Sequence, residues 1–478
     1  MAGTAYLHAM TKLISTDPAT GETVWEGQAA SPVEVAAAVD AARSAFPAWA
    51  RMPRDERVAA MKRYQASLKE LAPAFSEIIS RETGKALWET QAELAAMQGK
   101  IDISIRAQEE RAGQRQVETG FGRAVLRHRP HGVAAVLGPF NFPGHLPNGH
   151  ILPALLAGDT VVFKPSEEAP GTGEMIGKAM SMAGLPHGVF NIVQGGRETG
   201  AALLDQRIDA LMFTGSGAAG AHFRRKFADD PHVILALELG GNNPLVAWNF
   251  GDAEAAATLV AMSGWITTGQ RCSCARRLIV QDSEADALIE ALAALSDRLI
   301  VDAWNADPAP FMGPLISARA AEGALAQVES LVARGARVIR PLKSERGGAF
   351  VRPALLDVTE ARDLPDEEIF APVLQLRRVS SFDQAMEAAN DTKYGLSAGL
   401  LSNDGGLWDR FLDEIRAGVV NWNRPTTGAA GDMPFGGLGA SGNHRPSAYY
   451  AADYCAYPVA SFEADQVRST AGEIKGLA

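Results

Sequence analysis

Residues 210–220 read ALMFTGSGAAG, an apolar run that passes directly into a glycine-rich turn. The run has the length and composition of a buried strand, and the turn matches G-x-G-x-x-G at Gly215, Gly217 and Gly220, with Ser216 inside it. A helical pattern follows, and in this strand–turn–helix context such a turn can bind a pyrophosphate through free backbone N–H groups. The same glycines could instead serve close packing of strand against helix, and the spacing leaves both interpretations open.

More apolar runs lie on either side of this segment. Those in the same block are at 133–137, 160–163, 189–193 and 233–237, with helical patterns at 173–183 and 219–227. A second block has candidate strands at 245–248, 277–280, 337–339, 372–379, 396–401 and 418–422, with helical patterns at 253–262 and 285–299. Alternation of apolar strands with helices predicts parallel sheets that are covered on both faces.

The remaining segments frame these two blocks. Residues 33–108 read as helices, including stretches at 58–71 and 74–82, while 116–130 read as a hairpin and 453–461 as one further strand. We predict an α/β protein with a Rossmann-like cofactor domain, a second α/β catalytic domain and a small β element for oligomerisation. The predicted boundaries are 1–112 with 132–238, 239–440, and 113–131 with 453–478, and we expect a homodimer or homotetramer.

Composition narrows the function classes. The chain has 478 residues, and its 45 Lys and Arg against 56 Asp and Glu give a net charge of −11 without a long basic tract. A nucleic-acid partner is therefore not expected. Three cysteines form no disulfide framework, and neither a secretory signal at the start nor a membrane span is visible. We expect a cytoplasmic enzyme without a metal that acts on a small molecule.

Two polar residues lie in turns suited to covalent catalysis. Cys272 follows a helical stretch beside Arg271, and a positive neighbour lowers a thiol pKa and favours the nucleophilic thiolate. Asn141 lies between two prolines after the 133–137 strand, so its amide could donate to an oxyanion. The alternatives are a buried inert cysteine and an asparagine bonded to its own turn.

Glu238 has two competing interpretations. It lies 18 residues after Gly220, near the offset of an acid that binds a cofactor ribose. However, an earlier strand ends in Lys164, followed by Glu167, and ligands gather at the carboxyl edge of an open parallel sheet. Lys164 and Glu167 therefore compete for the ribose role, which leaves Glu238 free for catalysis.

Together these motifs resemble the aldehyde dehydrogenase superfamily over nearly the whole chain. The matching segments, in family order, are Asn141 in its proline frame, 164–167 (KPSE), 213–220 (FTGSGAAG), 238–241 (ELGG), 270–272 (QRC), 368–372 (EIFAP) and 434–437 (PFGG). The resemblance implies that Cys272 is the nucleophile, Glu238 the general base, and Asn141 with the Cys272 N–H the oxyanion hole. It also implies NAD as cofactor, held by Lys164, Glu167 and the glycine turn.

The same resemblance implies roles for two more residues, and the sequence departs from the family pattern at two places. Glu368 and Phe370 would hold the nicotinamide half of NAD, but Ala371 stands where the family usually has glycine. Residues 1–14 do not show the strand pair, with Gly and Trp, that usually opens family members.

Other stretches resemble one branch of the superfamily, which oxidises a semialdehyde carrying two carboxylates. They are 127–132, 144–150, 194–200, 421–423 and 442–445. The candidate anion partners are Arg271, Arg445, Arg424 and His150, because a guanidinium suits a carboxylate, although surface ion pairs are the alternative for each. Rival functions are another hydrolysing semialdehyde dehydrogenase, a CoA-acylating enzyme, or a non-catalytic protein that keeps the fold; the presence of Glu238 favours hydrolysis.

Overall fold

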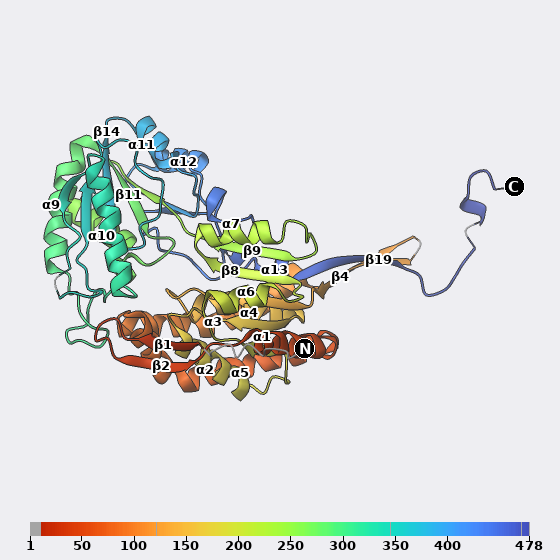
Figure 1. Ribbon diagram of the computed structural model, residues 1–478. Coiled ribbons are helices and arrows are strands. Elements are labelled where there is room, and N and C mark those ends of the chain that lie inside the picture. Colours follow the sequence, from red (N-terminus) through yellow and green to blue (C-terminus); the bar gives the residue numbers. More distant parts are fainter. Residues whose placement is uncertain (1–10, 121, 345, 470, 478) are drawn as a thin grey trace, which may run out of the picture.

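The computed structural model describes residues 11–120, 122–344, 346–469 and 471–477. Two mostly parallel sheets lie in different parts of the body in Figure 1, with β11 (Ala275–Gln281) and β14 (Val373–Val379) at upper left and β8 (Ala210–Gly215) and β9 (Ile234–Leu239) nearer the centre. The α/β prediction is confirmed, and most predicted strands agree with the observed ones to within two or three residues at each end.

The first sheet is entirely parallel and contains the segment 210–220. Its strands, in spatial order, are β7 (Phe190–Ile192), β6 (Thr160–Lys164), β5 (Val133–Leu137), β8 (Ala210–Gly215) and β9 (Ile234–Leu239). Every residue of β5 and β6 is buried, which explains why these strands read as continuous apolar runs.

Helices cover both faces of this sheet. One face packs on α2 (Arg54–Thr83), α3 (Leu87–Ala112), α4 (His145–Ala157) and α5 (Pro170–Met182) through a core that includes Tyr64, Met97 and Leu152. The other face packs on α1 (Pro32–Arg51), α6 (Arg197–Leu204) and α7 (Gly217–Lys226). The separate stretches predicted at 58–71 and 74–82 are one helix, α2, which runs through Pro73.

The second sheet follows Glu238 along the chain. Its order is β12 (Arg337–Arg340), β13 (Ala354–Asp357), β14 (Val373–Val379), β11 (Ala275–Gln281), β10 (Asn243–Ala247), β15 (Ser397–Leu401) and β16 (Val419–Trp422), with only β12 antiparallel to its neighbour. The covering helices are α8 (Ala253–Gly264), α9 (Asp282–Arg298), α10 (Ala318–Ala333), α11 (Phe382–Asn390) and α12 (Gly405–Glu414). Strand β13, only four residues long, was not predicted.

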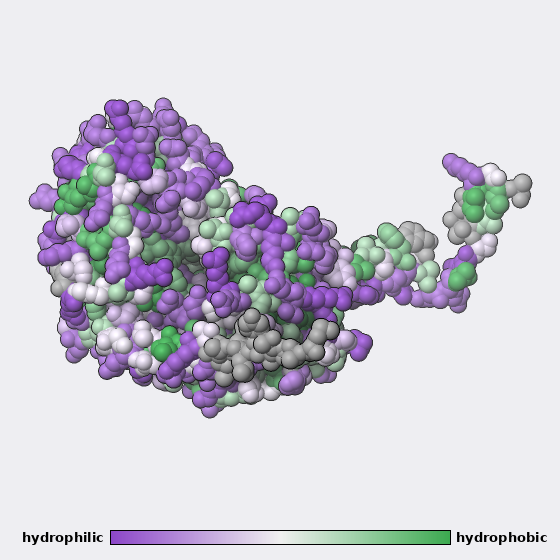
Figure 2. Space-filling view, viewed as in Figure 1, coloured by the Kyte–Doolittle hydropathy of each residue, from purple (hydrophilic) through white to green (hydrophobic). Residues whose placement is uncertain are grey.

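A third, antiparallel sheet projects from the body as an arm in Figures 1 and 2. It pairs β19 (Ala456–Glu463) with β4 (Gly122–Pro130) and β4 with β3 (Arg115–Thr119). Phe121, at the tip of the predicted hairpin, is not among the described residues. The strand predicted at 453–461 begins later than expected, because residues 451–454 form one helical turn, α13 (Ala451–Tyr454). The role of this antiparallel sheet in oligomerisation stays a prediction.

The chain opens with a strand pair that the sequence did not reveal. Strands β1 (Lys12–Thr16) and β2 (Thr23–Gln28) pair antiparallel, and Trp25 and Gly27 belong to β2. A Cβ on Gly27 would lie 2.2 Å from the Trp25 ring, so a larger residue there would require the indole to move. The expectation for residues 1–14 was wrong for 12–14, while 1–10 lie outside the described residues.

Candidate active site

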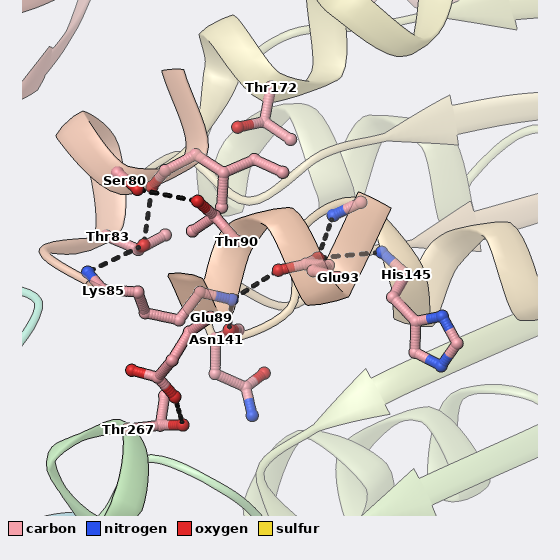
Figure 3. Close-up of polar contacts among 12 residues, drawn as sticks. Ser80, Thr83, Lys85, Glu89, Thr90, Glu93, Asn141, His145, Thr172 and Thr267 are labelled. Carbon is pink, nitrogen blue, oxygen red and sulfur yellow. Dashed lines mark hydrogen bonds and ion pairs between the residues drawn. The ribbon is translucent and has the colours of Figure 1, made fainter. Parts of the chain in front are cut away.

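A strained turn positions Cys272 between the two sheets. The turn η1 (Ile266–Gly269) holds Thr267 and Thr268 at φ of 54° and 53°, a region that non-glycine residues rarely adopt. The Thr268 hydroxyl donates to the Gly313 carbonyl at 2.8 Å, and the Thr267 hydroxyl donates to Glu89 (Figure 3). These bonds maintain the strained backbone, as is common where a reactive side chain must be held in place.

Buried polar side chains fix the rest of the Cys272 loop. The Asn243 amide donates to the carbonyls of Cys272 and Cys274 at 2.7 and 2.8 Å. Arg276, which is fully buried, donates to the Arg271 carbonyl at 3.0 Å. The backbone on both sides of Cys272 is therefore hydrogen-bonded to side chains of the second sheet.

Asn141 lines the same cavity as Cys272, at the carboxyl end of β5. Its side-chain amide donates to the Gln270 carbonyl at 2.9 Å, and its own backbone carbonyl accepts from Lys85 Nζ at 2.9 Å. An amide nitrogen carries two hydrogens, so one remains for a ligand in the cavity. Asn141 is bonded to distant segments and not to its own turn.

A buried ion pair supports Asn141 through its backbone carbonyl (Figure 3). Lys85 pairs with Glu93, whose other oxygen accepts from the N–H groups of Gly144 and His145 at 3.0 and 2.9 Å. These N–H groups are at the start of α4, where the helix dipole favours a carboxylate. The network joins α3, α4 and the Asn141 loop into one rigid wall.

Glu238 lies in β9, almost completely buried. One carboxylate oxygen accepts from the Ser447 N–H at 3.1 Å, and the other has no hydrogen-bond partner among the described residues. Burial raises the pKa of Glu238 well above its ordinary value, against the lowering effect of Ser447. Since Ser447 also lines the cavity of Cys272, this carboxyl lies just behind the cavity wall.

The surroundings of Cys272 raise its thiol pKa. Burial is the largest cause, the charges of Glu368 and Glu238 add to it, and Arg276 opposes it. The expectation that Arg271 favours the thiolate was wrong for this structure, because the Arg271 guanidinium instead bonds Thr267 at 2.7 Å and Glu89 at 3.2 Å. Cys274 is fully buried, and both cysteines are free thiols.

Glu368 and Phe370 lie on the second-sheet side of Cys272. Burial raises the pKa of Glu368 to about 7, although Arg276, 3.4 Å away, opposes the shift. The Phe370 ring meets Phe140 edge to face at 5.8 Å. Ala371, which replaces the expected glycine, is fully buried in the core of the second sheet, and its carbonyl accepts from Arg276.

A separate cavity opens at the carboxyl edge of the first sheet. It is lined by Lys164, Glu167, Ser216 and the first residues of α7, and encloses about 1900 Å³ including its open side. Lys164 Nζ donates to the carbonyls of Pro165 and Gly195 at 2.8 Å and lies 3.4 Å from Glu167. The size, the cations and the helix start suit a dinucleotide.

The glycines of the turn differ in what surrounds them. A Cβ on Gly220 would lie 2.6 Å from Leu239, so Gly220 serves close packing of α7 on β9. A Cβ on Gly217 would meet nothing within 4 Å, and on Gly215 it would meet the Phe213 ring. The packing interpretation therefore applies to Gly220, and phosphate binding by the turn stays a prediction.

The four residues predicted to bind substrate carboxylates do not lie around one cavity. Arg271 lines the Cys272 cavity, Arg445 lines a neighbouring hollow with Glu238, and Arg424 is exposed. His150 was expected beside the substrate but lies in the core, with its ring nitrogens 3.0 Å from the Tyr454 hydroxyl and 3.3 Å from the Thr214 hydroxyl. Burial lowers its pKa to about 4, so the ring is neutral and is not a cation for a carboxylate.

The Cys272 cavity contains polar residues that the sequence did not suggest. Lys100, on α3, and His145, at the start of α4, both line it. The available signal was helical spacing, since Glu89, Glu93, Ala96 and Lys100 recur on one face of a helix. The described residues contain no cluster of His, Cys, Asp and Glu that could hold a metal, and their helices include none long and apolar enough to cross a membrane.

Known proteins share both the sequence and this architecture. Residues 7–458 match the model of the aldehyde dehydrogenase family. N-succinylglutamate 5-semialdehyde dehydrogenase 2 of Caulobacter vibrioides is 66% identical over 97% of this chain and 96% of its own length. N-succinylglutamate 5-semialdehyde dehydrogenase of Paraburkholderia xenovorans is 52% identical over the same shares.

Solved structures of dehydrogenases have folds similar to that of this chain. An aldehyde dehydrogenase of Mycobacterium tuberculosis complexed with NAD⁺ superposes with a TM-score of 0.89 at 28% identity, covering 97% of this chain and 96% of that one. A 1-pyrroline-5-carboxylate dehydrogenase from Thermus with bound NAD gives 0.88 at 27% identity, covering 95% and 90%.

Proposed function

The chain belongs to the aldehyde dehydrogenase family, and we propose that it oxidises N-succinylglutamate 5-semialdehyde to N-succinylglutamate with NAD, as a step of arginine catabolism. The observation that carries the proposal is the combination of Cys272 and Asn141 in one cavity that also contains Arg271 and Lys100. Relatives of 52–66% identity that bear this substrate in their names support the same assignment.

We assign the nicotinamide cofactor to the cavity at the edge of the first sheet. Lys164 and Glu167 would hold the adenosine ribose, and Ser216 with the N–H groups at the start of α7 would hold the phosphates. Glu368 and Phe370 would hold the nicotinamide half, whose chemistry is to accept a hydride. In this assignment the first sheet and its helices form the cofactor domain, and the second sheet forms the catalytic domain.

The first half of the proposed reaction forms a covalent intermediate on Cys272. The Cys272 thiol loses its proton to solvent, and Glu238, whose pKa burial raises, keeps its basic oxygen for the second half. The sulfur then adds to the aldehyde carbon, and the Asn141 amide and the Cys272 N–H donate to the resulting oxyanion. Loss of hydride from the same carbon leaves a thioester on Cys272.

The second half hydrolyses that thioester. Glu238 removes a proton from water, the water oxygen attacks the thioester carbon, and the same two donors stabilise the second oxyanion. Collapse expels the Cys272 sulfur, which takes the proton held by Glu238, and releases the acid. The aldehyde carbon is thereby oxidised by two electrons, carried off as hydride, and water supplies the added oxygen.

Steady-state turnover on a panel of semialdehydes tests this function. The panel contains N-succinylglutamate semialdehyde, succinate semialdehyde, glutamate semialdehyde and butanal, each with NAD or NADP and with or without CoA. We expect the first substrate to have the highest kcat/KM, with NAD preferred and CoA without effect. A CoA requirement would show acyl transfer to a thiol, and equal or higher kcat/KM for succinate semialdehyde would overturn the substrate assignment.

A further inference from the structure

One face of helix α3 forms a wall of the Cys272 cavity. Glu89, Glu93, Ala96 and Lys100 all line it, at the spacing that places residues on one side of a helix. Glu89 holds Arg271, the residue adjacent to Cys272. Lys100 lies eleven residues further, about 16 Å along the helix axis, so it belongs to the end of the cavity remote from Cys272.

Lys100 is a buried cation that has no ion-pair partner within 4 Å among the described residues. It is 3% exposed, and the hydrogen bond recorded for its Nζ goes to the Gly431 carbonyl at 3.4 Å. The acid that acts on it electrostatically, Asp432, is half-exposed and pairs with Arg106 at 3.8 Å. Burial lowers the pKa of Lys100 to about 8.

Two other cations around the cavity, buried Lys85 and half-buried Arg271, differ from Lys100 because each has an ion-pair partner. Lys85 pairs with Glu93, and Arg271 pairs with Glu89. A buried charge without a counter-charge is costly, and one that lines a cavity can be compensated by an anion that enters the cavity. Arg271 is therefore already neutralised, whereas Lys100 is not.

His145, which lines the same cavity, has a ring nitrogen without a hydrogen-bond partner among the described residues. Its Nδ1 is buried and has no hydrogen bond, and burial together with the nearby Lys100 and Lys85 lowers its pKa to about 3. The ring is therefore neutral, with a proton on one nitrogen, and Nδ1 can donate in the appropriate tautomer. Lys100 and His145 thus offer a cation and a neutral donor to one ligand.

We propose that Lys100, assisted by Nδ1 of His145, binds the carboxylate at the end of the substrate remote from the aldehyde and thereby determines specificity. This inference rests on the proposed function, because it takes the succinyl carboxylate as the ligand. The position of Lys100 on α3 matches that assignment: the aldehyde must reach Cys272, and an extended substrate then directs its far end along the helix.

The test compares Lys100→Met with the parent on two substrates. These are N-succinylglutamate semialdehyde and N-butanoylglutamate semialdehyde, in which a methyl group replaces the distal carboxylate. We expect the ratio of their kcat/KM values to fall about tenfold or more in the variant, through KM of the succinyl substrate, because a hydrogen bond to a charged group is lost. Lys100→Arg should recover part of the ratio.

Two control variants separate recognition from a structural role. Lys69→Met removes an exposed lysine from α2, and Asp432→Asn removes the acid that faces Lys100. Both should keep the parent ratio. If Asp432→Asn lowers the ratio as much as Lys100→Met, Lys100 is a structural partner of Asp432 and the proposal fails.

Calorimetric binding of the two acids, N-succinylglutamate and N-butanoylglutamate, makes the test independent of turnover. We expect Lys100→Met to raise the Kd of the succinyl acid about tenfold or more relative to the butanoyl acid. Preferred turnover of the succinyl substrate with no change in Lys100→Met would refute the role of Lys100 alone. The parent could turn over another aldehyde fastest while Lys100→Met still loses the preference for the succinyl acid in binding. That pair of results would refute the substrate assignment alone. Equal parent affinity for both acids would refute both.

Discussion

Replacement of Glu238 by Gln separates the two halves of the proposed reaction. Glutamine has the same shape, and its carbonyl oxygen can still accept the Ser447 N–H that lies 3.1 Å from the carboxylate. What disappears is the charge and the basic oxygen that has no partner among the described residues. The substitution therefore removes chemistry with little loss of packing.

The expected magnitude follows from the role. Loss of a general base costs about 10²–10⁴ in rate, which corresponds to roughly 3–5.5 kcal/mol of activation free energy. A base acts in its deprotonated form, and burial raises the pKa of Glu238 well above 4.5. Thioester hydrolysis in the parent should therefore rise with pH through that raised pKa and then level off, and this rise should vanish in Glu238→Gln.

Stopped-flow mixing with NAD and substrate measures both halves. Glu238→Gln should give a burst of reduced cofactor followed by a steady state slowed by the factor above, since hydride transfer precedes hydrolysis. Glu167→Gln, a matched change in the cofactor cavity, should instead alter the KM for NAD. A parent-like steady state in Glu238→Gln would refute the base assignment, and a collapse of NAD affinity with intact chemistry would restore the ribose role for Glu238.

Four further variants, and a second measurement on Glu167→Gln, test other parts of the protein. Cys272→Ser should abolish aldehyde oxidation yet bind NAD by fluorescence titration, whereas Cys274→Ser, a change in the core, should keep turnover; the reverse result would place the nucleophile at Cys274. Asn141→Ala should slow the burst about 10²–10³-fold, the cost of one oxyanion donor, and an unchanged burst would contradict that role. Glu167→Gln should lower the preference for NAD over NADP, because a carboxylate repels a 2′-phosphate; an unaltered ratio of kcat/KM values argues against ribose binding. His150→Gln should reduce the acid sensitivity of folding, measured as the urea midpoint at pH 7 and pH 5: the folded pKa of about 4 lies below the ordinary 6.5, so protonation of the unfolded chain costs the parent about 2 kcal/mol on going to pH 5.

The two sheets could be predicted because their strands are buried on both faces. β5 and β6 are continuous apolar runs, and such runs are visible without knowledge of their neighbours. Strand β13 is equally buried, but its apolar run is only Ala354 to Leu356 and contains no β-branched or aromatic residue that would mark it as a strand. The strand pair β1 and β2 is mostly exposed or half-buried, so it carries no apolar pattern.

The predicted catalytic residues come from motifs. The structure adds their hydrogen-bond partners and their burial, which a motif does not contain. Cys272 and Asn141 lie on loops whose composition is unusual in itself. The partners that hold them, Asn243 and Lys85, lie on elements of ordinary composition, and their contacts exist only once the two sheets meet. The direction of the thiol pKa depended on burial, which outweighs the cations near Cys272.

The substrate residues show the same limit most sharply, because a helix gives each side chain its own direction. His145 and His150 lie five residues apart on α4, which rotates them by about 140° around the helix axis. One lines the Cys272 cavity and the other enters the core. Both belong to a stretch that resembles the same branch of the family. A resemblance identifies such a stretch but does not say which of its side chains face the cavity. Which side meets the substrate is decided by packing against α3, and that packing brings Lys100 to His145.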